Sequence, residues 1–147
     1  MSVDMSGLPD PVQNKNFYEG VAPRRFMAWV LDSLIILVLS LIAMVLSFFT
    51  LIFVAPFLVF FISAGYRWLL MRENSATLGM RWMHIEIRNG AGERLGDKQA
   101  LFHSALFSAL FFIPILPIIG MILMATNRFG QGLHDLPFGT TAILRPE

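Results

Sequence analysis

The hydrophobic positions of the chain are gathered into long runs, and the first run has no Lys, Arg, Asp, Glu or His between residues 33 and 66. Its 34 residues would make a single helix about 50 Å long, whereas the hydrocarbon core of a bilayer is about 30 Å thick. The run therefore predicts two transmembrane helices, over about residues 23–48 and 51–71, joined by a tight turn.

A second apolar run extends over residues 99–126, with His103 as its one titratable interruption and with Pro114 and Pro117 near its middle. It could be one kinked span of about 25 residues, because neighbouring helices can satisfy the backbone groups that a proline frees. It could also be a re-entrant hairpin that turns at residues 115–116, with arms too short to cross the bilayer. The kinked span is favoured, which predicts an all-α integral membrane protein with three transmembrane helices.

The polar segment between these runs, residues 72–98, has a different period. Met83, Ile85 and Ile87 alternate with polar residues, which is the pattern of a half-buried strand. Residues 89–92 have the composition of a turn, and residues 93–95 could return as a second strand. The pattern predicts a small cytoplasmic β-hairpin with Trp82 as an interfacial anchor, and the β-prone residues 140–144 could add a third strand.

The orientation follows from the basic residues, which are concentrated on the cytoplasmic side of membrane proteins. Two of them, Arg128 and Arg145, lie beyond the last apolar run. Nine lie on the side shared by the N-terminus and the middle loop: Lys15, Arg24, Arg25, Arg67, Arg72, Arg81, Arg88, Arg94 and Lys98. We therefore expect the N-terminus and the middle loop in the cytoplasm, while the side of the C-terminus stays open.

Composition restricts the classes of function. A net charge of +1 is too small for a nucleic-acid partner, and the lack of cysteine excludes disulfides, thiol catalysis and cysteine-based metal sites. The polar residues 1–19 are expected to be a largely disordered tail, and the apolar stretch after them is too long for a cleaved signal peptide. We expect no cofactor and no enzymatic activity, because the spans carry no nucleophile–base pair or metal cluster.

Three charged positions stand out in this hydrophobic chain: Arg25, Asp32 and Asp135. The surrounding motifs are RRFMAWVLD at residues 24–32, ATLGMR at residues 76–81, and GLHD at residues 132–135 with Gly-Thr at residues 139–140. In this order, with apolar runs between them, the motifs resemble the RDD family, which is named for one arginine and two aspartates. The residues before the final Gly-Thr are Pro-Phe, where the family more often has small or aliphatic residues.

The resemblance implies a membrane domain over residues 20–145, which we expect in a bacterial inner membrane. The molecular role of the family is poorly defined; transport of an unidentified ligand has been suggested for it, and cation/proton exchange has been proposed for some members.

The three charged residues have structural and functional interpretations. Asp32 lies on the same helix face as Arg25, so it could be a structural carboxylate satisfied by Arg25 or by Ser, Thr or Tyr hydroxyls. It could instead exchange protons or cations. Asp135, next to His134, is expected to anchor a turn or cap a helix rather than to bind a metal, because the histidines lack metal-ligand spacing.

Two functions remain. The first is a transport-related protein that works as an oligomer, because three helices cannot readily enclose a polar path. The second is a membrane scaffold or accessory subunit. The expected partners are the lipid bilayer and either further copies of the chain or another membrane protein. The surroundings of Asp32 discriminate between the two, since exposure to water or to other subunits favours transport and a sealed carboxylate favours a scaffold.

Overall fold

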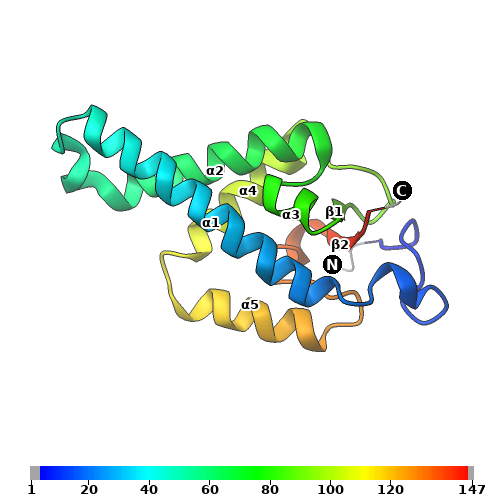
Figure 1. Ribbon diagram of the computed structural model, residues 1–147. Coiled ribbons are helices and arrows are strands. Elements are labelled where there is room, and N and C mark those ends of the chain that lie inside the picture. The colour runs from blue at the N-terminus through cyan, green and yellow to red at the C-terminus, as the bar shows by residue number, and fades with distance from the viewer. Residues whose placement is uncertain (1–3, 146–147) are drawn as a thin grey trace.

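The computed structural model describes residues 4–145 and is dominated by two long apolar helices (Figure 1). Helix α1 extends over Val21–Leu46 and α2 over Ala55–Asn74, with the 3-10 helix η2, Thr50–Val54, at the turn between them. Both are long and apolar enough to cross a membrane, so they are candidates for the two spans predicted over this run. Many of their large apolar side chains are exposed, among them Leu34, Leu37, Val38, Leu41, Val45, Phe57 and Phe61.

The last apolar run forms two helices rather than one. Helix α4, Asp97–Leu110, and α5, Ile115–Thr126, are bent by 119° relative to each other, at a break that ends with Pro114 as the N-cap of α5. By length and composition the pair is a broken span or a re-entrant loop. In Figure 1 the start of α4 and the end of α5 both lie toward the end of the molecule that carries the strands.

The sheet pairs a strand from the middle of the chain with one near its C-terminus. Strand β1, Ile85–Arg88, pairs antiparallel with β2, Thr141–Leu144, and Ile85 is opposite Leu144. The strand predicted at residues 140–144 is confirmed, and Ile85 and Ile87 are fully buried as expected.

The predicted hairpin is wrong, however. Residues 93–95 give only an isolated bridge between Arg88 and Arg94, because the backbone N–H of Leu95 donates to the Ser75 hydroxyl at 2.6 Å. That bond draws the chain away from β1, and Leu95 is buried in the core. The polar face of β1 differs too, since Glu86 is fully buried and paired with Arg88.

The core is confined to the end of the molecule that contains the strands. It joins the start of α1, the end of α2, the short helix α3, Leu78–Trp82, and both strands. Its buried apolar side chains include Ala28, Met71, Ala76, Met80, Ile85, Ile87 and Ala142. The outer half of α1 and α2 contributes few buried residues, so the fold consists of a packed end and a helix pair that extends away from it (Figure 1).

The segment before α1 packs against this end, contrary to the disorder expected for residues 1–19. The 3-10 helix η1, Lys15–Phe17, precedes α1, and Leu8 is 7% exposed. The N–H of Gly7 donates to the Gly90 carbonyl at 2.9 Å, and a Cβ on Gly7 would lie 2.0 Å from the carbonyl carbon of Ala91. Because glycine has no Cβ, the backbone at residue 7 can lie directly against the backbone of residues 90–91. Residues 1–3 lie outside the described part.

Candidate functional site

Asp32 is fully buried, and each of its carboxylate oxygens already has a partner. Oδ1 accepts hydrogen bonds from the Tyr66 hydroxyl at 2.8 Å and from the Gly79 backbone N–H at 2.9 Å. Oδ2 accepts from the Thr77 hydroxyl at 2.5 Å. These three donors come from α2 and from the first residues of α3. Asp32 therefore ties α1 to α2 and to the start of α3.

The backbone of α3 comes unusually close to α1 at this point. A Cβ on Gly79 would lie 2.3 Å from the Ala28 carbonyl oxygen and 2.9 Å from Asp32 Oδ1. Thr77 is the N-cap of α3, and its side chain accepts from the Met80 N–H while its hydroxyl donates to Asp32. The ATLG sequence thus supplies a cap, a donor and the space that Asp32 needs.

Arg25 forms a second buried site, which we call the clamp, with the segment that follows α5. Its Nη2 lies 2.7 Å from Asp135 Oδ2 and 3.1 Å from His134 Nε2, and its Nη1 donates to the Gly130 carbonyl. Arginine only donates, so His134 Nε2 is the acceptor and the ring is neutral. The clamp joins the first turns of α1 to residues more than 100 positions later in the chain.

Asp135 organises its own loop as well. Its Oδ2 accepts from the Gly132 N–H at 2.9 Å, and its Oδ1 lies 3.0 Å from the Thr140 hydroxyl and 2.9 Å from His103 Nε2. This is the turn anchor expected for Asp135. His103 joins it from α4, a partner that the sequence spacing did not indicate.

His103, His134 and Asp135 offer atoms within 4.8 Å of one another, a spacing that could suit a metal ion. Their surroundings do not fit one. Both oxygens of Asp135 are already occupied by donors, and the Arg25 guanidinium would repel a divalent cation placed among them. The cluster is therefore a hydrogen-bonded clamp rather than a metal centre.

The clamp also holds its titratable groups in fixed states. Burial opposes ionisation of Asp135, but the Arg25 charge and the hydrogen bond with His103 outweigh that effect and hold its pKa well below 3.8. Burial lowers the pKa of His134 well below 6.5, although the Asp135 charge works in the opposite direction. The clamp is therefore an ion pair of Arg25 and Asp135 next to a neutral histidine.

Arg67 differs from these residues because its guanidinium makes no hydrogen bond within the described part of the chain. It is 2% exposed, and its buried Nε has no partner. Its Nη2 lies 3.7 Å from Asp32 Oδ2, which is an ionic contact too long for a hydrogen bond. The guanidinium carbon lies 3.7 Å from the centre of the Phe107 ring, within range of a cation–π interaction.

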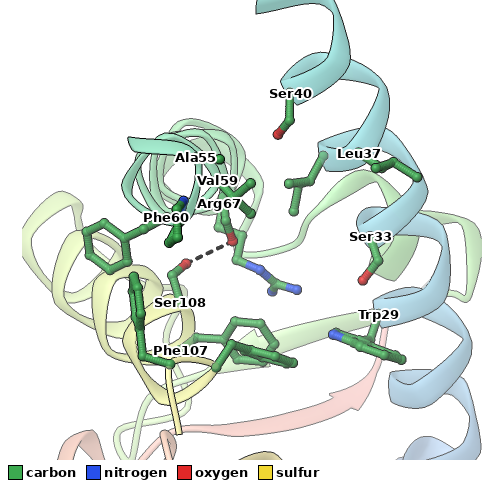
Figure 2. Close-up of a pocket in the computed structure, with 15 residues that line it drawn as sticks. Trp29, Ser33, Leu37, Ser40, Ala55, Val59, Phe60, Arg67, Phe107 and Ser108 are labelled. Carbon is green, nitrogen blue, oxygen red and sulfur yellow. Dashed lines mark hydrogen bonds between the residues drawn. The ribbon is translucent and has the colours of Figure 1, made fainter. Parts of the chain in front are cut away.

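The Arg67 guanidinium extends into a cavity of about 650 Å³ between α1, α2 and α4, which we call the Arg67 cavity (Figure 2). Its walls are mostly apolar, and its few polar groups include Ser33 and the linked pair Ser63 and Ser108, whose hydroxyls lie 2.9 Å apart. The Ser40 oxygen, also on the wall, is buried without a partner. Buried polar atoms without a hydrogen-bond partner, such as Ser40 Oγ and Arg67 Nε, are unusual in proteins and mark a candidate site.

A second cavity of about 510 Å³ lies between α1, α4 and α5 and reaches Arg25 and His134. Arg67 lines this cavity too, as do the stacked rings of Trp29 and Phe111, whose centroids are 6.0 Å apart. The Arg67 guanidinium thus lies where the two cavities meet.

The sequence identified Arg25, Asp32 and Asp135 as the charged residues that matter, but the structure pairs them differently. Arg25 binds Asp135 and not Asp32, while Asp32 takes the hydroxyl partners that were the other alternative. The side chains of a helix lean toward its N-terminus, so Arg25 points away from a residue two turns further on.

The sequence places Arg67 among the basic residues of the cytoplasmic side, and the structure buries its side chain between helices. It lies five residues before the exposed Arg72, which places it more than one helical turn deeper along α2. That offset was the signal in the sequence that could have revealed it.

The chain matches the sequence model of the RDD family over residues 20–139, which is most of its length. Neither the curated proteins nor the solved structures give a match.

Proposed function

Because the chain belongs to the RDD family of membrane proteins, its function lies in the bilayer, and we propose that it is a transport-related protein whose ligand is an anion bound at Arg67. The observation that carries this proposal is a buried guanidinium without a hydrogen bond at the junction of two cavities. A guanidinium presents its donors in a planar fork that fits a carboxylate or a phosphate.

The two buried carboxylates offer little to a transported cation. Asp32 and Asp135 are both fully buried, and their oxygens are turned toward donors of the protein itself. The charged groups that line the cavities are Arg25 and Arg67, and both are cations. The sign of the accessible charge therefore favours an anion over Na⁺, K⁺ or a proton.

We further propose that α4 and α5 form a re-entrant hairpin and that both termini are cytoplasmic. Each arm is too short to cross the bilayer, and the strand pairing brings β2 back to the middle loop. All eleven Lys and Arg residues would then lie toward one side, which strengthens the positive-inside argument.

Single cysteines test this topology cleanly, because the natural chain has none. Lys98→Cys and Arg128→Cys should both react with an impermeant maleimide only after the cell is permeabilised. Labelling of Arg128→Cys in intact cells would contradict the re-entrant arrangement and support a third crossing.

Two spans and a hairpin enclose little space, so passage of a ligand across the membrane would require several copies or a partner membrane protein. The alternative, a scaffold without transport, is supported by the sealed surroundings of Asp32. It gives no reason for a cavity beside a buried Arg67 guanidinium that makes no hydrogen bond within the described residues.

Calorimetric titration of the protein in neutral phosphatidylcholine nanodiscs tests the proposal, with octanoate as the anionic probe and octyltrimethylammonium as the cationic counterpart. Octanoate should bind at least ten-fold more weakly to Arg67→Gln than to the wild type, while the exposed control Arg72→Gln should bind normally. Equal binding by Arg67→Gln would overturn the proposal.

The alternative hypothesis of cation/proton exchange can be tested in proteoliposomes under Na⁺ or K⁺ gradients, with a pH-sensitive dye inside. Neither the wild type nor Asp32→Asn should exchange these ions for protons. An exchange activity that Asp32→Asn abolishes would restore the cation/proton function and contradict an anionic ligand.

A further inference from the structure

We infer that the ligand of the Arg67 cavity is an acyl-chain amphiphile with an oxyanion head, either a free fatty acid or an anionic phospholipid, which enters from the cytoplasmic leaflet. This inference rests on the proposed anion site and adds the chemistry of the rest of the ligand. It is carried by the shape and composition of the cavity beyond the guanidinium.

The cavity continues from Arg67 along α2 as far as Ala55, a distance of about 18 Å at the helical rise. Apolar groups such as Ile36, Val59 and Phe60 line this length, and the volume of about 650 Å³ lies within the range of roughly 300–1,000 Å³ found for ligand pockets. A small inorganic anion would leave most of this apolar length unfilled, whereas an acyl chain would cover it.

The cavity is bordered by side chains of the lipid-facing surface. Leu37 on α1, Val59 on α2 and Phe112 after α4 line it and are 54%, 44% and 49% exposed. Figure 2 shows Leu37 on α1 and Val59 on α2, the helices on either side of the cavity. A chain could therefore enter sideways from the bilayer without passing through water.

The direction of the cavity matches that of a lipid. With the packed end in the cytoplasm, Arg67 lies nearer the cytoplasmic surface and Ala55 nearer the opposite surface. An inner-leaflet lipid has the same polarity, with its oxyanion toward the cytoplasm and its chain toward the midplane. The polar groups at the Arg67 level, Ser33 and the Ser63–Ser108 pair, suit the head, and the deeper walls suit the tail.

Collisional quenching of Trp29, which lines the cavity, provides the test. A protein carrying Trp68→Phe and Trp82→Phe retains Trp29 as its one tryptophan, and 2,3-dibromostearate, whose bromines lie beside the head, is titrated into neutral nanodiscs that contain it. Quenching should saturate and should need at least ten-fold less dibromostearate than the corresponding dibromo alcohol, which lacks the oxyanion. A protein with Trp82 alone, which is 71% exposed, reports general partitioning and should be quenched without saturation.

Two variants locate the binding. Arg67→Gln should weaken the saturable quenching at least ten-fold. Ser40→Phe should block the deep part of the cavity without touching the guanidinium, and it remains informative if Arg67→Gln does not fold, because the Ser40 oxygen has no partner to lose. Leu39→Phe, at an exposed position on the lipid side of α1, is the matched control and should bind normally.

The probes separate the possible sources and outcomes. Brominated phosphatidic acid that competes as well as dibromostearate identifies a phospholipid head as acceptable, and its failure restricts the site to fatty acids. Equal quenching by the alcohol, or equal quenching in Ser40→Phe, overturns the inference. Arg67-dependent binding of acetate or inorganic phosphate as tight as that of dibromostearate would overturn the inference while leaving the anion site intact, and no Arg67-dependent binding of any probe would remove both.

Discussion

Arg25 and Arg67 are both buried on long helices beside an aspartate, but their guanidinium groups have opposite surroundings. Arg25 reaches Asp135, His134 and a carbonyl within hydrogen-bond distance, whereas Arg67 has no hydrogen bond in the described chain and lies against a ring and a cavity. Burial next to a carboxylate therefore does not distinguish a structural arginine from a binding one. The two differ instead in the number of guanidinium N–H donors that lack a hydrogen-bond acceptor.

The largest expected difference between the two arginines is in stability. Arg25→Gln should lower the free energy of unfolding by about 3–5 kcal/mol, because it leaves the Asp135 carboxylate buried without its ion pair. Arg67→Gln should cost about 1–2 kcal/mol, because it removes the contact with the Phe107 ring and the longer 3.7 Å contact with Asp32, whose oxygens keep their three hydrogen-bond donors. Reversible unfolding in detergent measures both, and an equal cost would contradict the division between clamp and cavity.

The closed surroundings of Asp32 can be tested by adding a single methyl group. Gly79→Ala should cost about 1–3 kcal/mol, since its Cβ would collide with the Ala28 carbonyl of α1. Gly65→Ala in α2 is the matched control, because nothing lies within 4 Å of its Cβ, and it should be neutral or stabilising. If the two variants have the same free energy of unfolding, Gly79 is not packed against the Ala28 carbonyl of α1.

The clamp should also make stability depend on pH. Unfolded His134 gains a proton near pH 6.5 that the buried neutral ring does not accept, so stability should fall as the pH drops below 6.5, by at most about 1.4 kcal/mol per pH unit. Below pH 3.8 a further loss follows, because unfolded Asp135 becomes protonated first.

Denaturation at several pH values measures this slope. His134→Gln should flatten it between pH 6.5 and 5, while His84→Gln, at an exposed position outside the clamp, should retain the wild-type slope. An unchanged slope in His134→Gln would mean that the ring is not held neutral by the fold.

The smallest effect is expected at the far end of the Arg67 cavity. Ser40→Ala removes a buried hydroxyl oxygen that has no partner, so the free energy of unfolding should change by less than about 0.5 kcal/mol or rise slightly. A loss well above 1 kcal/mol in the same unfolding assay would show that the hydroxyl has a partner in the membrane, and that this end of the cavity is closed.

The features that could be predicted from the sequence were those that depend on residues close together along the chain. The charge-free run indicated two spans, the alternation around Ile85 and Ile87 indicated a strand, and the motifs indicated the family. The partner of strand β1 could not be predicted from the sequence, because β1 pairs with a strand more than 50 residues later and not with the nearby residues 93–95. A buried hydrogen bond to Ser75 decided that outcome, and no periodicity records it.

The charged residues show the same limit. Seven residues place Arg25 and Asp32 on one helix face but about 10.5 Å apart along the axis, and the backward tilt of the side chains directs Arg25 to the C-terminal segment instead. The sequence counts Arg67 among the basic residues of the cytoplasmic side, because composition does not show which of them are buried between helices. Its role became visible when three helices were in place around it.

The NH₂ groups of the Arg25 guanidinium are hydrogen-bonded, whereas those of Arg67 have no hydrogen bond among residues 4–145, and ¹⁵N-detected NMR of the arginine guanidinium nitrogens tests this difference most directly. Arg67→Lys and Arg25→Lys assign the two signals by their disappearance. On addition of oleate to the protein in neutral nanodiscs, the Arg67 signal should shift saturably into the range of a hydrogen-bonded guanidinium, while the Arg25 signal stays in place. An Arg67 signal that is already hydrogen-bonded before oleate is added, or that does not respond to it, would contradict the account.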